Sequence, residues 1–386
     1  MCFVIIFRGV SVFFHCKFLS YCLFVALLFF AGGCQPAEKE PIRIGFIGGL
    51  TGRAAAVGVP ARDGAMMAVN QVNRAGGIHG RKVELITKDD KQDRETGIRA
   101  VRELIEAGVP AIIGPLTSTM AVEMVPIANQ SDTLIVSPTA GTVALSQLDD
   151  NFLRLRPQCR TIANKLADYV VDNRGLKRFA VLADERNSTY TSDWRHSFEK
   201  RLESRGGKIV SLVAFSSGGT HRFGELAETV IDNNPSGILI LANALDTAMF
   251  AQQLMKKGVK IPLFTSEWSM TRDLLRSGGR SVEGITLFHV FNEASTKRKY
   301  LDFKELYQME FGQEPSFPVI HGYDAMQIVL AGLQMGARTG PELKKVLLQL
   351  ESFDALQSSL RFDPYGDIQR DLFLTVVKNG KFVVVQ

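Results

Sequence analysis

The sequence predicts an α/β protein made of two similar domains, each built on a parallel sheet. From Pro41 onward, short β-rich segments alternate with amphipathic segments that have helical spacing. Strands that alternate with helices of about 10–15 residues are typical of parallel sheets with right-handed crossovers. The pattern restarts after Arg156, and 386 residues are enough for two domains. We therefore expect two sheets, each with its own helices.

The first series begins with a buried strand over 42–48, which ends in a glycine-rich turn. The helix that follows has small and apolar residues at helical spacing from Ala61 to Val72, and Gly76-Gly77 ends it. Asp93 is a suitable N-cap for a helix that runs to about Ala107. The remaining elements of this series are expected strands at 82–89, 111–114 and 133–137, and a helix at 118–130.

The second series has the same alternation, and a C-terminal part follows it. Its expected helices are 160–173, 191–205, 222–233 and 244–257, and its expected strands are 178–184, 208–215, 237–242 and 261–266. The C-terminal part is expected to have helices at 300–311, 319–336 and 341–350, followed by strands with turns at 363–366 and Asn379-Gly380. Asn-Gly between two apolar β-runs predicts a hairpin.

Composition excludes several classes of protein. Apolar residues make up 46 % of the chain and charged residues 22 %, which is typical of a globular protein and excludes disorder or a polytopic membrane protein. Removing residues 1–33, which contain Arg8, Lys17 and no acidic residue, lowers the net charge from +5 to +3. No basic block interrupts the body, so nucleic acid is not an expected partner.

The N-terminus resembles a bacterial lipoprotein signal. Residues 18–33 are almost wholly apolar, and Cys34 follows three small residues. This run is short for a membrane-spanning helix but suits a signal peptide. The resemblance implies that residues 1–33 are removed, that Cys34 is lipidated and that 34–40 form a tether. Cleavage elsewhere and an uncleaved anchor are the alternatives. Cys159 is then the one cysteine of the body, expected as a small core residue.

Motifs for catalysis are missing from the sequence. It contains no nucleophile elbow, no H-E-x-x-H, no Walker phosphate loop and no paired C-x-x-C. The early glycines lack dinucleotide-binding spacing, and the five body histidines are too scattered for a zinc site. We therefore expect a protein that is not an enzyme and that holds no cofactor and no metal.

Polar groups do follow several expected strands. Ser118 lies in GPLTST, which opens a helix, where backbone N–H groups and the helix dipole favour an anion such as a carboxylate. SPTAGT (137–142) follows the next strand. Glu267 ends a strand of the second series, where a carboxylate facing a cleft would attract an ammonium. Helix capping by Ser118 and an exposed, idle Glu267 are the alternatives. Together these groups predict a site for a zwitterion.

Several ordered motifs extend along the body of the chain: IRIGFIGGLTG (42–52), NRAGGIHGRKVEL (73–85), IGPLTS (113–118), Ser137-Pro138 and RFDPYG (361–366). Together they resemble the leucine/isoleucine/valine-binding protein family, the type I periplasmic solute receptors of ABC importers. The resemblance implies two Rossmann-like lobes with parallel sheets, joined by three crossover strands and closing on the ligand. By this resemblance lobe 1 would comprise 41–158 plus 291–372, and lobe 2 would comprise 159–290 plus 373–386.

The resemblance also implies roles for individual residues. Ser118 would bind the ligand carboxylate, Thr139 and Ala140 would lend backbone groups, and Tyr190 and Glu267 would meet the ammonium. Three positions depart from the family. Gly141 stands where a threonine often helps to hold the carboxylate, Asn243 stands where amino-acid binders often have a tyrosine, and Val57 replaces a frequent aromatic residue. A branched-chain amino acid is the first expectation for the ligand, and amides, other amino acids and aromatic acids stay open.

The expected function is that of an extracytoplasmic solute-binding lipoprotein of an ABC importer. Its partners would be the ligand, an ABC permease in the inner membrane and the membrane that holds its lipid, and we expect a monomer in the periplasm or cell envelope. The alternative is a ligand-sensing or regulatory lipoprotein of the same fold.

Overall fold

The computed structural model describes residues 39–385, and residues 41–385 belong to one compact unit. The predicted signal peptide and Cys34 lie outside the described residues. Among the residues described, no helix is both long and apolar enough to cross a membrane.

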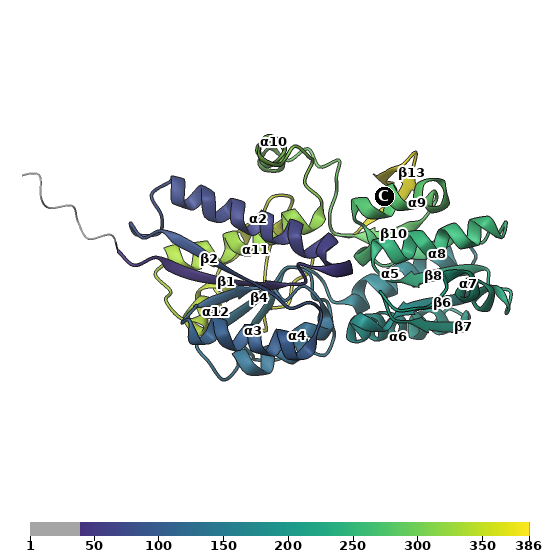
Figure 1. The fold of residues 1–386 in the computed structure, drawn as a ribbon, viewed down its shortest axis with the longest axis horizontal. Coiled ribbons are helices and arrows are strands. Elements are labelled where there is room, and N and C mark those ends of the chain that lie inside the picture. The colour runs from purple at the N-terminus through teal and green to yellow at the C-terminus, as the bar shows by residue number, and fades with distance from the viewer. Residues whose placement is uncertain (1–38, 386) are drawn as a thin grey trace, which may run out of the picture. The chain divides into compact units, whose positions relative to one another are not determined.

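A five-stranded parallel sheet forms the centre of what we call the first lobe (Figure 1). Its strands are β1 (Ile42–Gly48), β2 (Val83–Asp89), β3 (Ala111–Ile113), β4 (Leu134–Ser137) and β5 (Phe152–Arg154). Their order is β2-β1-β3-β4-β5. Since the chain adds β2 on one side of β1 and β3 on the other, the loops after β1 and β3 separate at a topological switch point, where ligands bind in such sheets.

Helices cover both faces of this sheet. They are α2 (Ala55–Arg74), α3 (Arg94–Glu106), α4 (Ser118–Ala128), α11 (Phe317–Gln334) and α12 (Gly340–Leu348). A further helix, α10 (Arg298–Phe311), packs against α11 through Phe303 and Tyr323. Phe46 belongs to the core cluster beneath α2 and α11, and its neighbour Ile47 to the cluster beneath α3 and α4, as the alternation of a strand requires. A Cβ on Gly64 of α2 would lie 2.1 Å from the carbonyl oxygen of Val319, so glycine allows α2 and α11 to approach closely.

A seven-stranded sheet forms the centre of the second lobe. Its strands are β6 (Arg178–Asp184), β7 (Lys208–Phe215), β8 (Gly237–Leu241), β9 (Leu263–Thr265), β10 (Thr286–His289), β13 (Phe373–Lys378) and β14 (Lys381–Val384), in the order β14-β13-β10-β9-β8-β6-β7. Its helices are α5 (Cys159–Asp172), α6 (Ser188–Ser204), α7 (Phe223–Ile231), α8 (Ala244–Lys256) and α9 (Arg272–Gly278). Five strands are parallel, and the β13–β14 hairpin adds an antiparallel edge.

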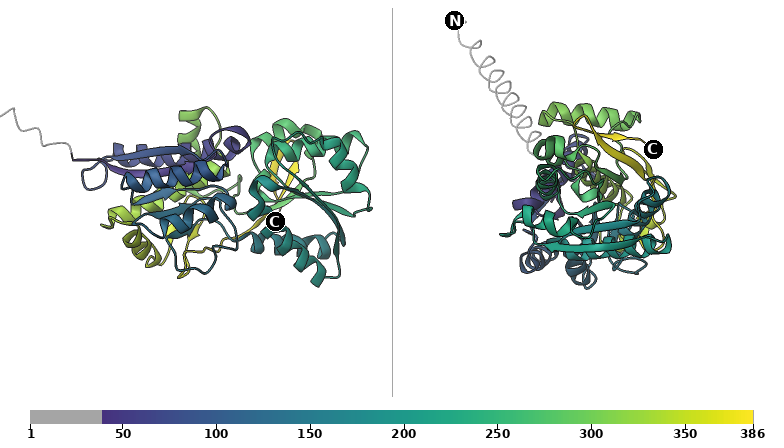
Figure 2. Two further views of the ribbon diagram at one scale, coloured as in Figure 1. Left: turned by 60° about the horizontal axis from the view of Figure 1, so that its bottom comes forward. Right: turned by 90° about the vertical axis from the view of Figure 1, so that its right-hand side faces the viewer.

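The chain passes between the lobes three times: after β5, after β10 and before β13. Figure 2 shows the C-terminal strands in the second lobe, where the β13–β14 hairpin forms one edge of the sheet beside β10. A small hairpin of β11 (Phe353–Asp354) and β12 (Ser359–Leu360) precedes the third crossing. The predicted α/β class with two parallel-sheet lobes is confirmed.

Most predicted elements are present, with ends that move by a few residues. Asp93 caps α3 by accepting a hydrogen bond from the Thr96 N–H, as predicted. Asn379 and Gly380 both have positive φ, which is the geometry of a tight hairpin turn. The sequence analysis missed β5, β10, β11 and α9. These elements have three, four, two and seven residues, which is too short for a periodic pattern to appear.

The predicted core position of Cys159 is also confirmed. It is fully buried at the start of α5, and its thiol donates a hydrogen bond to the carbonyl oxygen of Gly141 at 2.6 Å. Burial raises the pKa of the thiol to about 12, so the reactive thiolate is not formed at neutral pH.

Candidate functional site

A cavity lies where loops from both lobes meet. Strand ends and helix starts line it, as expected for parallel α/β sheets. Four of the residues that the sequence predicted for the site line this cavity, namely Ser118, Thr139, Tyr190 and Glu267. Three do not line it: Ala140, Gly141 and Asn243.

Ser118 is the first residue of α4 and is almost completely buried. Its hydroxyl oxygen accepts a hydrogen bond from the Gly141 N–H at 3.1 Å. Thr117, which also lines the cavity, precedes the helix and makes no side-chain capping bond. The alternative that Ser118 caps its own helix is therefore wrong. The hydroxyl instead ties the α4 start to the loop after β4, at the cavity wall.

The loop after β4 exposes Thr139 to the cavity and turns the next two residues away. The Thr139 hydroxyl donates to the carbonyl oxygen of Leu116 at 2.6 Å. The Ala140 N–H donates to the hydroxyl of Ser137 at 3.0 Å, and the Gly141 N–H is held by Ser118. Both backbone donors thus already have partners inside the first lobe.

Asn243 has a different role from the one implied by the resemblance. It is the N-cap of α8, and its side-chain oxygen accepts a hydrogen bond from the Asp246 N–H at 3.0 Å. Its amide nitrogen donates to Ser217 and to the Asp246 carboxylate. An asparagine fits this capping geometry, whereas a tyrosine at this position could not make these short local bonds.

Glu267 begins a 3₁₀ turn directly after β9 and is only 6 % exposed. One carboxylate oxygen forms an ion pair with the guanidinium of Arg156, and the other accepts a hydrogen bond from the Trp194 indole at 3.3 Å. The alternative of an exposed, idle glutamate is therefore wrong. The carboxylate is buried at the cavity with a cationic partner that the sequence analysis did not anticipate.

Arg156 follows β5 and lines the cavity. A second guanidinium nitrogen donates to the carbonyl oxygen of Thr139 at 3.1 Å, and the guanidinium carbon lies 5.6 Å from the centre of the Tyr190 ring. Arg156 and Glu267 are 111 residues apart in sequence, so no local pattern could reveal this pair. The one available local signal is a charged residue two positions after a short buried strand.

Gly141 makes room for this arginine. A Cβ at Gly141 would lie 2.7 Å from the guanidinium carbon of Arg156, so any side chain there would press on the guanidinium. The glycine at 141 therefore leaves the space that the guanidinium of Arg156 occupies at the cavity wall.

The Tyr190 ring packs beside these charges. It lies edge-on to Trp268, with 5.9 Å between the ring centres. Burial raises the pKa of its phenol above the usual range, so the hydroxyl stays protonated and can donate a hydrogen bond. In the described structure this hydroxyl makes no hydrogen bond of normal geometry.

The remaining wall is mainly apolar, with two histidines. Its side chains include those of Val57, Leu116, Ile162, Trp268, Val290, Phe317, His289 and His321. Burial, reinforced by nearby arginines, keeps the pKa of both histidines well below the ordinary value, so they are neutral. No group of His, Cys, Asp or Glu in the described part of the chain could hold a metal ion.

Hydrogen bonds between the lobes surround the cavity. Asp193 of α6 accepts from the Thr142 hydroxyl at 2.6 Å and from the Val143 N–H at 2.8 Å. The Thr119 N–H of α4 donates to the side chain of Asn187 at 3.2 Å. The site is therefore built from two lobes in contact, with polar and oppositely charged groups on an otherwise apolar wall.

Comparison with known proteins identifies the family. A family model described as periplasmic binding protein matches residues 41–381. The chain belongs to this family. It has the type I periplasmic-binding-protein fold, and its resemblance to Leu/Ile/Val-binding proteins is confirmed. These are solute-binding proteins rather than enzymes.

Three relatives illustrate the similarity. The Leu/Ile/Val-binding protein homolog 3 of Brucella melitensis is 25% identical over 92% of this chain and 95% of its own length. A branched-chain amino acid transporter substrate binding protein of Streptococcus pneumoniae, solved in complex with isoleucine, superposes with a TM-score of 0.81 at 23% identity, over 89% of this chain and 97% of its own. A solute binding protein of an ABC transporter from Rhodopseudomonas palustris was solved in complex with 3,4-dihydroxybenzoic acid. It superposes with a TM-score of 0.79 at 22% sequence identity, over 90% of this chain and 96% of its own.

Proposed function

We propose that this protein is the extracytoplasmic solute-binding lipoprotein of an ABC importer and captures a small amino acid or related carboxylate between its lobes. The observation that carries the proposal is the Arg156–Glu267 ion pair at a cavity also lined by Ser118 and Thr139. A buried pair of opposite charges beside hydroxyl groups matches the head group of a zwitterion.

The unused hydrogen-bonding capacity of the pair supports this assignment. A carboxylate accepts about four hydrogen bonds, and a guanidinium has five N–H donors. Glu267 receives one bond from Arg156 and one from Trp194, so its oxygens retain lone pairs for an ammonium. Arg156 retains donors for a carboxylate.

Electrostatics favours a neutral zwitterion over a simple acid. The Arg156–Glu267 pair has no net charge, so a zwitterion adds none to a cavity of low polarity. An acid without an amine would bring a second negative charge beside Glu267, and charges interact strongly where water is excluded. The relatives that bind isoleucine or carry Leu/Ile/Val-binding names favour an amino acid, while the dihydroxybenzoate complex keeps an aromatic acid as the second candidate.

The mode of action that follows is closure on the ligand. A ligand that contacts both lobes favours the closed form by its difference in affinity for the two forms. The closed protein, held to the membrane through a lipid on Cys34, would then present its lobes to the permease. Replacing Cys34 by Ser is expected to move the protein from the membrane fraction to the soluble fraction.

Thermal unfolding tests the proposal directly. The protein, freed of co-purified ligand, is heated with L-amino acids, their amides and aromatic acids. A ligand at 100 times its dissociation constant adds about 2.7 kcal/mol, which raises the midpoint by a few degrees. We expect shifts with amino acids. Shifts only with acids that lack an amine would remove the ammonium role of Glu267, and no shift with any compound would contradict solute binding.

A further inference from the structure

The strongest unassigned feature of the cavity is the pair of buried histidines. His321 lies one turn into α11, is 2 % exposed and lines the cavity. Neither of its ring nitrogens makes a hydrogen bond within the described residues. An unpaired buried polar group destabilises a folded protein, so such a group at a binding cavity points to a ligand that pairs with it.

His289 lies beside His321. The two rings are stacked with 6.0 Å between their centres, and the Phe317 ring lies 4.8 Å from His289 and 5.7 Å from His321. The Nδ1 atom of His289 accepts a hydrogen bond from the Phe291 N–H at 2.7 Å. A neutral imidazole that accepts at Nδ1 carries its proton at Nε2, so His289 is fixed as a donor on its other side.

The chemistry of these two rings defines what they can recognise. Neutral His321 offers one N–H donor and one acceptor nitrogen. A hydroxyl or a carboxamide can both donate and accept, so either group can pair with a neutral imidazole. A methyl or methylene group can do neither. An anion is less suitable, because uncharged imidazoles do not balance its charge.

From this geometry we infer that the natural ligand carries an uncharged hydrogen-bonding group, a hydroxyl or a carboxamide, that pairs with His321. This inference rests on the proposed function and narrows its substrate class. The expected ligand therefore has a polar side chain rather than a purely aliphatic one such as that of leucine. An aliphatic ligand would leave both nitrogens of His321 buried and unpaired.

Matched pairs of ligands test the inference. Dissociation constants are measured by calorimetry, on the protein freed of co-purified ligand, for threonine against valine, asparagine against leucine, tyrosine against phenylalanine, and 4-hydroxybenzoate against benzoate. In at least one pair, the one whose size fits the cavity, we expect the polar compound to bind at least about tenfold more tightly than its apolar counterpart. The apolar compound would leave the buried nitrogens of His321 unpaired. If the apolar compound binds as tightly as the polar one in every pair that binds at all, the inference is overturned and the proposed function stays intact.

Variants of His321 assign the preference to this residue. His321→Phe keeps an aromatic ring beside His289 but removes both polar nitrogens, and His321→Gln keeps a donor and an acceptor. We expect the preference for the polar ligand to vanish in His321→Phe and to persist in His321→Gln. His196→Phe, at an exposed position of α6, is the matched control.

Each other outcome has a definite meaning. An unchanged preference in His321→Phe would contradict the assignment to His321. If His321→Phe fails to fold, His321→Gln decides, since loss of the preference there would also contradict it. Binding of none of the eight compounds to the wild-type protein would overturn the proposed function together with this inference.

Discussion

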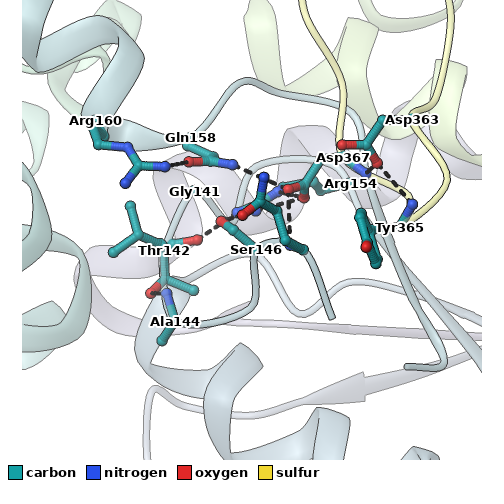
Figure 3. A network of polar contacts seen from close by, with 12 residues as sticks. Gly141, Thr142, Ala144, Ser146, Arg154, Gln158, Arg160, Asp363, Tyr365 and Asp367 are labelled. Atoms are coloured by element: carbon teal, nitrogen blue, oxygen red, sulfur yellow. Dashed lines mark hydrogen bonds and ion pairs between the residues drawn. The ribbon is translucent and has the colours of Figure 1, made fainter. Parts of the chain in front are cut away.

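Two arginines that lie only two residues apart in the sequence, Arg154 and Arg156, each form a buried ion pair with a carboxylate, and the two pairs differ in what surrounds them. Arg154, at the end of β5, is fully buried and bonds Asp367 through Nε at 2.7 Å. Its other nitrogens donate to the carbonyl oxygen of Thr142 at 2.5 Å and to the hydroxyl of Ser146 at 2.6 Å (Figure 3). Gln158 donates to the same aspartate at 3.0 Å.

The Arg154–Asp367 network joins three segments that belong to, or flank, the crossings between the lobes. Figure 3 shows the segments 141–146, 154–160 and 363–367 meeting around this guanidinium. Every guanidinium nitrogen of Arg154 donates to an acceptor of the protein. The Arg156–Glu267 pair, by contrast, lies at the cavity and joins the first lobe to the second. Arg156 keeps unused hydrogen-bond donors, and Glu267 keeps unused acceptors. The same chemistry therefore stabilises the fold at one position and is available to a ligand at the other.

Removing Arg154 should have the largest effect on stability. Arg154→Met leaves Asp367 as a buried, unpaired charge, which destabilises a protein by about 3–5 kcal/mol. Urea denaturation measures the loss, and Arg160→Met is the control, since Arg160 is exposed and bonds only Gln158 among the contacts of this network. A loss below about 1 kcal/mol would show that the network is not a stabilising one.

Removing the charge of Glu267 should instead act on binding. Glu267→Gln is expected to weaken amine-bearing ligands by about 2–5 kcal/mol, the range for loss of a buried charge partner. Calorimetry measures the change, and Glu199→Gln, at a half-buried ion pair with Arg195 on α6, is the control. Unchanged affinity for every amino acid that binds would exclude Glu267 from the site and would remove the contrast between the two pairs.

A side chain at Gly141 should disturb Arg156 alone. In Gly141→Ala the new methyl group would press on the guanidinium, whose flexible side chain can move away. We expect ligand affinity to fall by about 1.5–3 kcal/mol, the value of a hydrogen bond to a charged group, with a smaller loss of stability. Equal losses of stability and affinity would indicate that the loop after β4, rather than Arg156, is displaced.

The neutral histidine provides the smallest test, through pH. Burial, Arg370, His289 and Arg156 lower the pKa of His321 in the folded state below its ordinary value of 6.5. Its contribution to the free energy of unfolding is therefore present above pH 6.5 and is lost as the pH falls, by up to about 1.4 kcal/mol per pH unit. The difference between wild type and His321→Phe, measured from pH 7.5 to 5, should show this slope. A constant difference would show that His321 binds protons equally in the folded and unfolded states, and it would contradict the lowered pKa.

The sequence was sufficient for the lobes because their elements follow local rules. The strands around Ile47 and Leu239 are apolar runs bounded by turns, and the caps at Asp93 and the turn at Asn379-Gly380 are short-range signals. Short strands such as β10 were not predicted from the sequence, because their pairing depends on strands that are distant in the chain.

The site was predicted in part for the same reason. Ser118, Thr139 and Glu267 lie in the segments that follow β3, β4 and β9, so their placement at the cavity follows from the order of elements. Arg156 and His321 depend on contacts across the two lobes and between α11 and β10, which only the folded chain brings together. Asn243 was misplaced because its amide is used by the α8 cap.

The position of the β13–β14 hairpin also sets the order in which the lobes can be completed during synthesis. The sheet of the second lobe is complete only when residues 373–384 pair beside β10. The last strand of the first sheet ends at Arg154, but α11 and α12, which cover this sheet, begin only at residue 317. Neither lobe can therefore finish before nearly the whole chain has emerged. Such distant pairings form slowly, so we expect a chain that leaves the ribosome or a translocation channel to complete both lobes late.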